Sequence, residues 1–215
     1  KEVVAYELGG LLGGAVDTTQ HVVLWLLLNL ASHANVQKRL AAELDSVLRG
    51  GNYSKDVKKH LPYLQAVIRE SHRRNHTNPL ITMRRLESDI ELAGYNIPAG
   101  TRISFNGADM QQDPALVEHP EEFRPERFMP DAVEERKDDP LRSIIDHRLL
   151  ATPFGHGARM CVGARVAENE IWALMCRIFQ DFELSLEPPD QSWKVAMPFM
   201  TVADPFPSIK VSRRA

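Results

Sequence analysis

Apolar residues recur at three- and four-residue spacing in four stretches of the chain, which is the pattern of amphipathic helices. Gly50 and Gly51 end the second stretch, and Pro62 suits the first turn of the third. The spacing therefore predicts helices over residues 1–33, 36–48, 61–74 and 161–180.

Between the third and fourth helices the apolar pattern alternates, as in strands. Ile90–Leu92 and Arg102–Phe105 both alternate, with turn residues at 94–96 and 98–100, which predicts a short antiparallel sheet within 84–105. Residues 106–163 are rich in proline and weakly periodic, with one short helix expected over 141–150, and segments of that length are typically functional. Strand-like residues return over 197–212. The fold class expected is mainly α with a small β component.

The composition is that of a globular chain. Its 215 residues are 43% hydrophobic and 26% charged, with 26 basic against 29 acidic side chains, a net charge of −3. This balance predicts no nucleic acid partner. The longest unbroken apolar run, Val22–Leu28, is far shorter than the ~20 residues of a transmembrane helix, and no signal peptide pattern is present. The chain lacks an initial Met and starts inside an expected helix, so we expect it to be part of a longer protein.

The two cysteines, Cys161 and Cys176, are not expected to form a disulfide. Along a helix their separation corresponds to about 22 Å, whereas a disulfide requires Cα atoms within about 7 Å. The cysteines are therefore buried thiols or functional ligands.

The most specific motif is Phe154-Gly-His-Gly-Ala-Arg-Met-Cys161-Val-Gly163. It places a cysteine after a glycine-rich turn and before a helix, where unpaired N–H groups and the positive helix end favour a thiolate. With no second cysteine or histidine at zinc spacing, a thiolate here suits a metal that takes one protein ligand, such as haem iron. The alternative is a buried structural cysteine.

This segment resembles the haem-binding loop of the cytochrome P450 superfamily, Phe-x-x-Gly-x-Arg-x-Cys-x-Gly. Phe154, Gly157, Arg159, Cys161 and Gly163 match the five fixed positions. The resemblance implies that Cys161 is the axial ligand of haem b (iron protoporphyrin IX). It also implies that Phe154 and Gly157 line the cofactor and that Arg159 pairs with a propionate.

Three further segments resemble the same superfamily in the expected order. Glu70 and Arg73 match the Glu-x-x-Arg pair of the K helix (61–74), and Arg127 matches the meander arginine that completes a buried triad. Arg84 matches the strand arginine that binds a haem propionate, with Arg85 as the alternative if the register differs by one.

Residues 14–19 resemble the oxygen-binding stretch of the I helix (1–33). Gly14 and Ala15 would lie against the haem, although the family usually has glycine where Ala15 stands. Asp17 and Thr18 match the acid–alcohol pair that relays protons, and because adjacent helical residues do not face each other, the relay would run through water. The alternative is a solvent-facing Asp17 and a packed Thr18.

The resemblance divides the chain, as one partial P450 domain (1–215), into a sheet (84–105), a meander and haem-binding loop (106–163), an L helix (161–180) and C-terminal strands (197–212). The chain departs from the family at His76, where proline is common.

His72 and His76 lack the HExxH pattern of zinc peptidases and are expected to be packed or solvated. Four basic residues could face an acidic electron donor, but a solvated helix face is the favoured interpretation: Lys58, Lys59, Arg69 and Arg74.

By resemblance, the parent protein is a haem-thiolate monooxygenase that inserts one atom of O₂ into a substrate. Its electrons would come from a separate protein, either a ferredoxin, as for mitochondrial members, or a flavoprotein reductase. The apolar Phe199 and Met200 favour a lipophilic substrate. Association with the mitochondrial or endoplasmic reticulum membrane would depend on a segment upstream of this chain.

Two alternatives keep part of this interpretation. Some family members rearrange peroxides or dehydrate substrates without external electrons, but those often lack the pair that Asp17 and Thr18 match. The other alternative is a truncated, non-catalytic fragment that does not hold haem. Haem uptake separates this fragment from both enzymes, and electron dependence separates the enzymes from each other.

Overall fold

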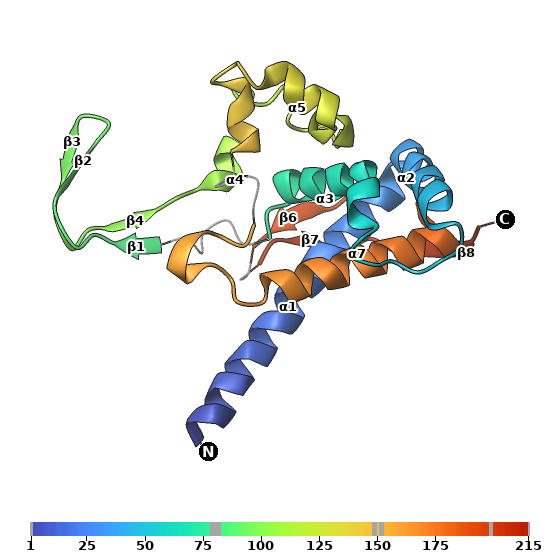
Figure 1. Cartoon of the computed structure of the whole chain (residues 1–215), viewed down its shortest axis with the longest axis horizontal. Coiled ribbons are helices and arrows are strands. Elements are labelled where there is room, and N and C mark those ends of the chain that lie inside the picture. Colours follow the sequence, from blue (N-terminus) through green and yellow to red (C-terminus); the bar gives the residue numbers. More distant parts are fainter. Residues whose placement is uncertain (1, 78–82, 148–149, 151–152, 198–199, 215) are drawn as a thin grey trace.

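The computed structural model describes the chain except for residues 1, 78–82, 148–149, 151–152, 198–199 and 215. Its helices lie close to the predicted ranges, and short helical turns divide the long proline-rich segment (Figure 1). The helices are α1 (Glu2–Ser32), α2 (Ala34–Leu48), α3 (Pro62–Arg74), α4 (Gly107–Met110), α5 (Pro130–Arg136) and α7 (Ala164–Asp181), with 3₁₀ turns η1 (Lys58–His60), η2 (Pro125–Phe128), η3 (Arg142–Asp146) and η4 (Gly157–Arg159).

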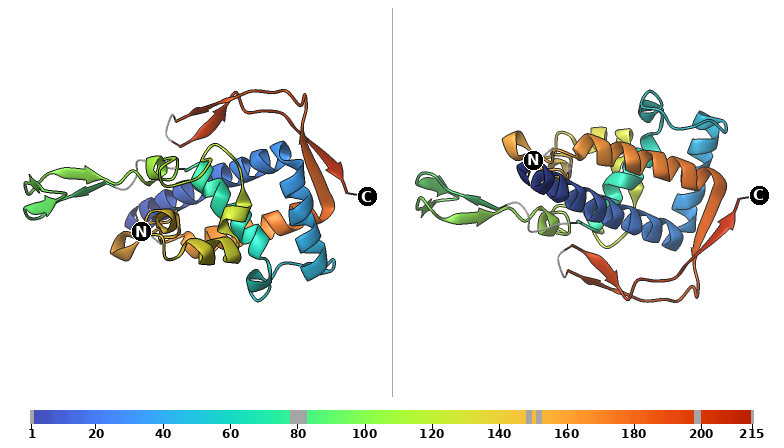
Figure 2. Two further views of the ribbon diagram at one scale, coloured as in Figure 1. Left: turned by 90° about the horizontal axis from the view of Figure 1, so that it is seen from above. Right: turned by 90° about the horizontal axis from the view of Figure 1, so that it is seen from below.

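The core is formed by the C-terminal half of α1 together with α2, α3 and α7. Figures 1 and 2 show α7 running beside α1, with α2 closing one end of both helices. Each helix contributes fully buried side chains at helical spacing, and burial of this apolar surface is the main force that holds the four helices together. The fully buried residues include Leu26, Leu30, Leu40, Leu44, Leu64, Val67, Met175 and Phe179.

Helix α3 begins at Pro62, and its first N–H groups are satisfied by a side chain from another helix. Glu43 on α2 accepts hydrogen bonds from the backbone N–H groups of Tyr63 and Leu64, at 2.7 and 2.9 Å. A carboxylate at a helix N-terminus binds unpaired donors and interacts favourably with the helix dipole. Glu43 thereby fixes the start of the helix that carries Glu70 and Arg73.

The strands form four separate two-stranded antiparallel pairs. They are β1 (Met83–Arg85) with β4 (Arg102–Ser104), β2 (Ile90–Leu92) with β3 (Tyr95–Ile97), β5 (Phe182–Leu186) with β8 (Ile209–Arg213), and β6 (Lys194–Ala196) with β7 (Val202–Asp204).

The antiparallel strands expected within 84–105 are present, as two separate strand pairs. Ile90–Leu92 pairs with Tyr95–Ile97, which the sequence pattern assigned partly to a turn, whereas Arg102–Ser104 pairs with Met83–Arg85. The reason is a tight two-residue turn at Ala93 and Gly94, both with positive φ (52° and 82°). Such a turn suits the twist of two directly paired strands.

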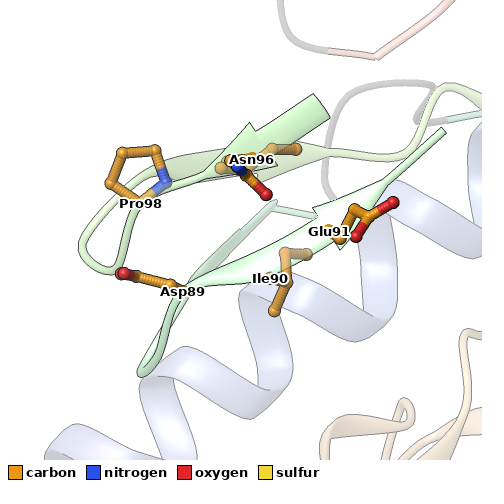
Figure 3. A pocket seen from close by; sticks show the side chains of 6 residues that line it. Asp89, Ile90, Glu91, Asn96 and Pro98 are labelled. Atoms are coloured by element: carbon orange, nitrogen blue, oxygen red, sulfur yellow. The ribbon is translucent and has the colours of Figure 1, made fainter. Parts of the chain in front are cut away.

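The hairpin β2–β3 projects from the helical body on the extended arm of β1 and β4 (Figures 1 and 2). Asp89, Glu91 and Asn96 line a hollow of about 390 Å³ along it (Figure 3). None of the predicted site residues lines this hollow.

Two further expectations need correction. Within 141–150, where one short helix was expected, the described residues contain the 3₁₀ turn η3 over Arg142–Asp146, and residues 148–149 lie outside the described residues. The strand β5, which follows α7 directly, was not expected. Within the strand-like range 197–212, the described strands are β7 (Val202–Asp204) and most of β8 (Ile209–Arg213). Phe199 lies outside the described residues, and Met200 is buried.

Among the described residues, one helical stretch, Leu8–Ser32, is long and apolar enough to cross a membrane by length and composition alone. Polar residues such as Asp17 interrupt this stretch, so its longest unbroken apolar run, Val22–Leu28, is much shorter than the stretch itself. From Trp25 to Leu30 the same helix is mostly buried within the chain, as a core helix would be.

We expect Glu43→Ala to lower the free energy of unfolding by about 1–2 kcal/mol, because two N–H groups of α3 lose their acceptor. The measurement is a urea titration followed by circular dichroism. Glu135→Ala, which removes an exposed carboxylate of α5, is the control and should leave the midpoint unchanged. Equal midpoints for both variants would contradict the capping role.

Candidate functional site

The segment that carries Cys161 is held as a tight turn in front of α7. Gly155 and Gly157 have φ values of 71° and 73°, a left-handed conformation that side chains with a Cβ rarely adopt. The Cys161 N–H donates to the carbonyl of Phe154 at 2.9 Å, closing the turn. Helix α7 then begins at Ala164, with Gly163 as its N-cap.

The Cys161 side chain is exposed, whereas Cys176, further along α7, is buried. Both are free thiols, in agreement with the argument against a disulfide. A methyl group on Gly163 would lie 3.9 Å from the Cys161 sulfur, in ordinary van der Waals contact. The loop therefore presents one accessible sulfur on a backbone fixed by its own hydrogen bonds.

The two arginines predicted to bind propionates are both exposed. Arg84 Nη1 donates to the carbonyl of Met83 at 2.8 Å, and within the described chain neither Arg84 nor Arg159 forms an ion pair with a carboxylate. The guanidinium of Arg85 instead lies against Gly100, where a Cβ would be 3.5 Å from Nη2. Arg84 and Arg85 are both exposed on β1.

Glu70, Arg73 and Arg127 come together in the interior. Arg73 binds the Glu70 carboxylate through Nε at 2.8 Å and Nη2 at 3.0 Å, and Arg127 Nε binds it at 2.9 Å. The three residues are 0%, 1% and 6% exposed, respectively. Bidentate pairing of guanidinium with carboxylate is the strong form of this interaction.

The remaining donors of the two arginines bind the backbone of the segment that precedes the cysteine loop. The Arg124 N–H adds a further bond to Glu70 Oε1, at 2.9 Å. Five carbonyl oxygens accept from the guanidinium groups: those of Gln111, Pro120 and Glu122 from Arg73, and those of Glu118 and His119 from Arg127. The network therefore fixes backbone that has little regular secondary structure.

The predicted oxygen-side residues lie on the projecting N-terminal half of α1. Thr18 donates its hydroxyl to the carbonyl of Gly14 at 2.7 Å, and Asp17 is exposed. Gly14 and Ala15 are exposed as well, and a Cβ on Gly14 would meet no atom within 4 Å. This part of α1 also exposes a group of large apolar side chains: Leu8, Leu11, Leu12 and Val16.

The N-terminal half of α1 and the segment before α7 lie at the same end of the molecule (Figures 1 and 2). The segment before α7 carries the accessible Cys161 sulfur and the exposed Arg159, the N-terminal half of α1 carries the apolar surface, and the exposed Arg84 lies on β1. Haem needs one soft axial ligand, cations for its propionates and apolar contact for its faces. The donor set fits that cofactor.

Residues 1–211 match the family model described as Cytochrome P450. The chain belongs to the cytochrome P450 family. Membership implies a haem cofactor, and the predicted mainly α fold with a small β component is confirmed.

Named relatives include plant and animal P450 proteins. The chain is 41% identical over 179 residues to trans-cinnamate 4-monooxygenase C4H1 of Petunia hybrida, 38% over 180 residues to trans-cinnamate 4-monooxygenase of Glycyrrhiza echinata, and 36% over 181 residues to cytochrome P450 10 of Lymnaea stagnalis. These alignments cover 82–83% of this chain and 31–34% of the relatives. The chain thus spans about a third of the length of the curated relatives it matches.

The other candidate residues of the sequence are dispersed. Lys58 pairs with Glu168 at 3.1 Å, and Arg69 pairs with Asp146 at 2.9 Å and stacks on Phe128. Both charges are therefore paired within the P450 chain itself. These contacts do not support a common docking face for an electron donor.

Sequence reasoning missed Gln111 and Gln112, whose side chains bind backbone around the buried network. Gln111 Nε2 donates to the carbonyl of Leu150 at 3.3 Å, and Gln112 Nε2 donates to the carbonyls of Arg73 and Arg74 at 2.9 and 3.2 Å. The only sequence signal for them is a pair of glutamines at the start of a weakly periodic segment.

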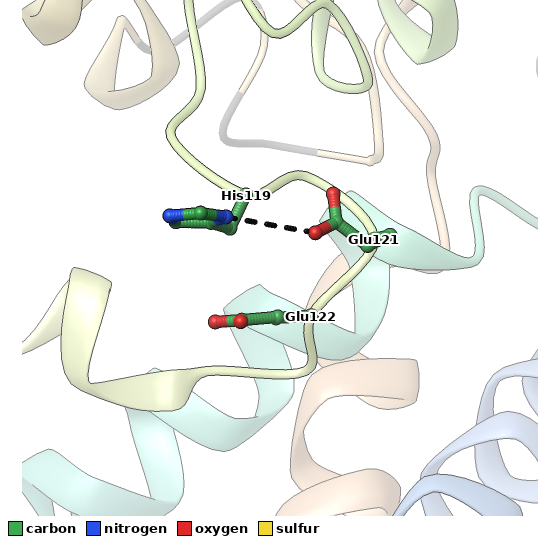
Figure 4. A group of neighbouring side chains, drawn as sticks. All are labelled: His119, Glu121 and Glu122. Atoms are coloured by element: carbon green, nitrogen blue, oxygen red, sulfur yellow. Dashed lines mark ion pairs between the residues drawn. The ribbon is translucent and has the colours of Figure 1, made fainter.

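One group of side chains in the described chain could hold a metal ion (Figure 4). His119, Glu121 and Glu122 have ligand atoms within 4.8 Å of one another, and His119 Nδ1 lies 3.6 Å from Glu121. All three are exposed, and Glu122 also lies 4.0 Å from Arg124. The backbone of the same loop holds Arg73 and Arg127, so its demonstrated contacts are structural.

We expect Glu70→Gln to lower the free energy of unfolding by about 3–5 kcal/mol, because it leaves two buried guanidinium groups without their carboxylate. Urea titration is the measurement. Glu134→Gln, which breaks an exposed pair with Lys137, is the matched control and should change the midpoint little. A loss no larger than that of the control would contradict a buried, mutually dependent network.

Burial, with a smaller contribution from the nearby His76, lowers the pKa of His72 to about 4. Between about pH 6.5 and pH 4 the unfolded chain therefore binds a proton that the folded chain does not. This proton uptake by the unfolded chain lowers the free energy of unfolding as the pH falls from about 6.5 toward 4, whereas above about pH 6.5 His72 causes no such loss. We expect His72→Gln to show a smaller decrease in urea midpoint from pH 7 to pH 4.5 than the wild type, and parallel decreases would contradict this assignment.

Proposed function

We propose that this chain is the C-terminal part of a haem-thiolate monooxygenase. The observation that carries the proposal is the exposed Cys161 sulfur, held by a glycine-rich turn closed onto Phe154, in a chain that belongs to the P450 family. Because the chain spans about a third of the matched relatives, the activity is proposed for the complete protein.

Each proximal residue has a distinct role in this proposal. Cys161 ligates the iron of haem b as a thiolate, and Phe154 and Gly157 line the cofactor where the turn leaves room for it. Arg84 and Arg159 pair with the propionates in this proposal, which is supported because both guanidinium groups are exposed and neither forms an ion pair with a carboxylate of the described chain. The bound haem supplies the activation of O₂ and the insertion of one oxygen atom into a C–H bond of the substrate.

Asp17 and Thr18 are proposed to move protons to the oxygen side of the cofactor, beside Gly14 and Ala15. The Thr18 hydroxyl donates its proton to the carbonyl of Gly14, so its oxygen remains available to accept a hydrogen bond from water. The exposed Asp17 carboxylate can exchange protons with the same water. This arrangement supports a relay through water between two side chains that do not face each other.

We propose a ferredoxin or a flavoprotein reductase as the separate electron donor, and a lipophilic small molecule as substrate. The named relatives include trans-cinnamate 4-monooxygenases, which supports a monooxygenase reaction without fixing the substrate of this chain. Membrane association through an upstream segment belongs to the same proposal. The acid–alcohol pair favours this reaction over an electron-independent rearrangement.

The test is the absorption spectrum of the chain after haem addition, reduction and exposure to carbon monoxide. We expect a strongly red-shifted Soret band for the wild type and for Cys176→Ala, and its loss in Cys161→Ala, because thiolate ligation of the iron produces the shift.

Retention of the red-shifted band in Cys161→Ala would overturn the assignment of the ligand. Absence of haem uptake by the wild type, with uptake by a chain extended upstream, would show that this chain alone is a fragment that does not hold haem. Absence in both would overturn the proposed function.

A further inference from the structure

The buried half of α1 is apolar on nearly every side. Val22–Leu28 is an unbroken apolar run, and Leu26, Leu28 and Leu30 are fully buried. An apolar stripe determines which side of a helix packs inward, whereas a helix that is hydrophobic all round has no preferred side. The rotation of α1 about its own axis must therefore be fixed by contacts other than apolar burial.

The first such contact is made by Asn29, which is buried. Its Nδ2 donates to Ser71 Oγ of α3 at 3.1 Å and to Oδ1 of Asn75, the C-cap residue of α3, at 2.9 Å. Ser71 and Asn75 are buried as well. A different rotation of α1 would leave a buried carboxamide without its partners, which is costly.

The second contact is made by Trp25, whose Nε1 donates to the carbonyl of Thr201 at 2.9 Å. Thr201 is itself held by the chain that leaves α3. Its N–H donates to the carbonyl of Thr77 at 3.1 Å, and its hydroxyl donates to the carbonyl of His76 at 2.7 Å. Trp25 and Thr201 are both buried, so this contact also connects α1 to the end of α3.

The side of α1 that makes these contacts is also the side that carries Thr18. At 3.6 residues per turn, Trp25 and Asn29, seven and eleven residues later, each lie within about 20° of Thr18 around the helix axis. Helix α1 is continuous over Glu2–Ser32. The rotation fixed at Trp25 and Asn29 therefore also fixes the direction of Thr18.

We propose that Trp25 and Asn29 are positioning residues that set the rotation of α1, and with it the side of the helix that Thr18 presents to the cofactor. Buried polar contacts specify one arrangement among those that apolar packing alone would allow. The inference rests on the proposed function only for the role of Thr18. The rotation of the helix belongs to this chain and can be measured without haem.

The alternative is that these contacts add stability without deciding the rotation. Gln111→Leu is the matched control for Asn29→Leu, because Gln111 is also a buried carboxamide. The Gln111 side chain donates to the carbonyl of Leu150 at 3.3 Å, and none of its described hydrogen bonds involves α1. Its loss should lower stability and leave α1 in place.

The experiment measures distances between pairs of spin labels in the haem-free chain. One label is placed at Gly10→Cys or at Leu12→Cys, two exposed positions of α1 that lie on nearly opposite sides of the helix. The other label is placed at Glu170→Cys, an exposed position of α7. The two native cysteines are replaced by Cys161→Ala and Cys176→Ala, so that each protein carries only the chosen labels.

We expect a single distance for each label pair in the wild type and in Gln111→Leu. In the double variant Trp25→Phe/Asn29→Leu a second distance should appear. It should differ from the first by about 5 Å, because side chains lie about 5–6 Å from the helix axis. The second distance should be longer for one α1 label and shorter for the other, because rotation moves opposite sides of a helix in opposite directions.

Two single variants keep the test available if the double variant does not fold. Asn29→Leu removes only one of the two contacts. Asn75→Leu removes an acceptor of Asn29 from the α3 side and leaves the sequence of α1 unchanged. Both should show the same second distances in a smaller fraction of the molecules.

A second readout follows the side of the helix that faces the cofactor. In a chain extended upstream and loaded with haem, the C–O stretching frequency after reduction and addition of carbon monoxide responds to polar groups near the bound gas. Thr18→Val and Asn29→Leu should both shift this frequency relative to the wild type. Gln111→Leu should not, because a loss of stability alone does not change the groups that face the cofactor.

Unchanged single distances in the double variant and in Asn75→Leu would overturn the inference. Equal broadening for both α1 labels, without opposite shifts, would also overturn it in favour of a purely stabilising role. If the distances shift as expected but Thr18→Val leaves the C–O frequency unchanged, the proposed role of Thr18 fails and the positioning of the helix stands.

Discussion

The buried carboxylate of Glu70 is the interaction on which the rest of the structure depends. One negative charge accepts from two guanidinium groups and one backbone N–H, all within 3.0 Å. Taking these charges out of water is costly, so the arrangement is stable only if every remaining donor also finds a partner. The neighbouring backbone carbonyls of Pro120 and Glu122 are among those partners.

This requirement explains how a long segment with little regular secondary structure becomes ordered. The described part of residues 106–163 contains only short helices, 3₁₀ turns and irregular chain, so many carbonyl groups there have no partner in a helix or sheet. Buried carbonyls must be hydrogen-bonded. Arg73 and Arg127 supply the donors, and the same bonds that satisfy the arginines determine the course of the chain toward the cysteine loop.

The two sides of the candidate site are built differently. The sulfur side is a turn closed by its own backbone bonds and supported by the helical core through α7. The opposite side is the N-terminal half of α1, where Leu8, Leu12 and Val16 are exposed and the glycines make no close contact. This P450 chain, which spans about a third of its matched relatives, thus contains a well-supported cysteine loop and an exposed apolar helix face.

The sequence by itself determined the main helices and the family to which the chain belongs, because both depend on local order. Apolar spacing placed α3 to within a residue, and the fixed spacing from Phe154 to Gly163 was enough to indicate the P450 family, while the role of Cys161 as haem ligand stays a prediction. Only the tertiary structure decided which strands pair around Ala93 and which residue links the network to Leu150. The physical reason is that the network and its link are built largely from backbone carbonyls, which every residue carries. A sequence pattern therefore cannot show that Gln111 is the residue that joins them.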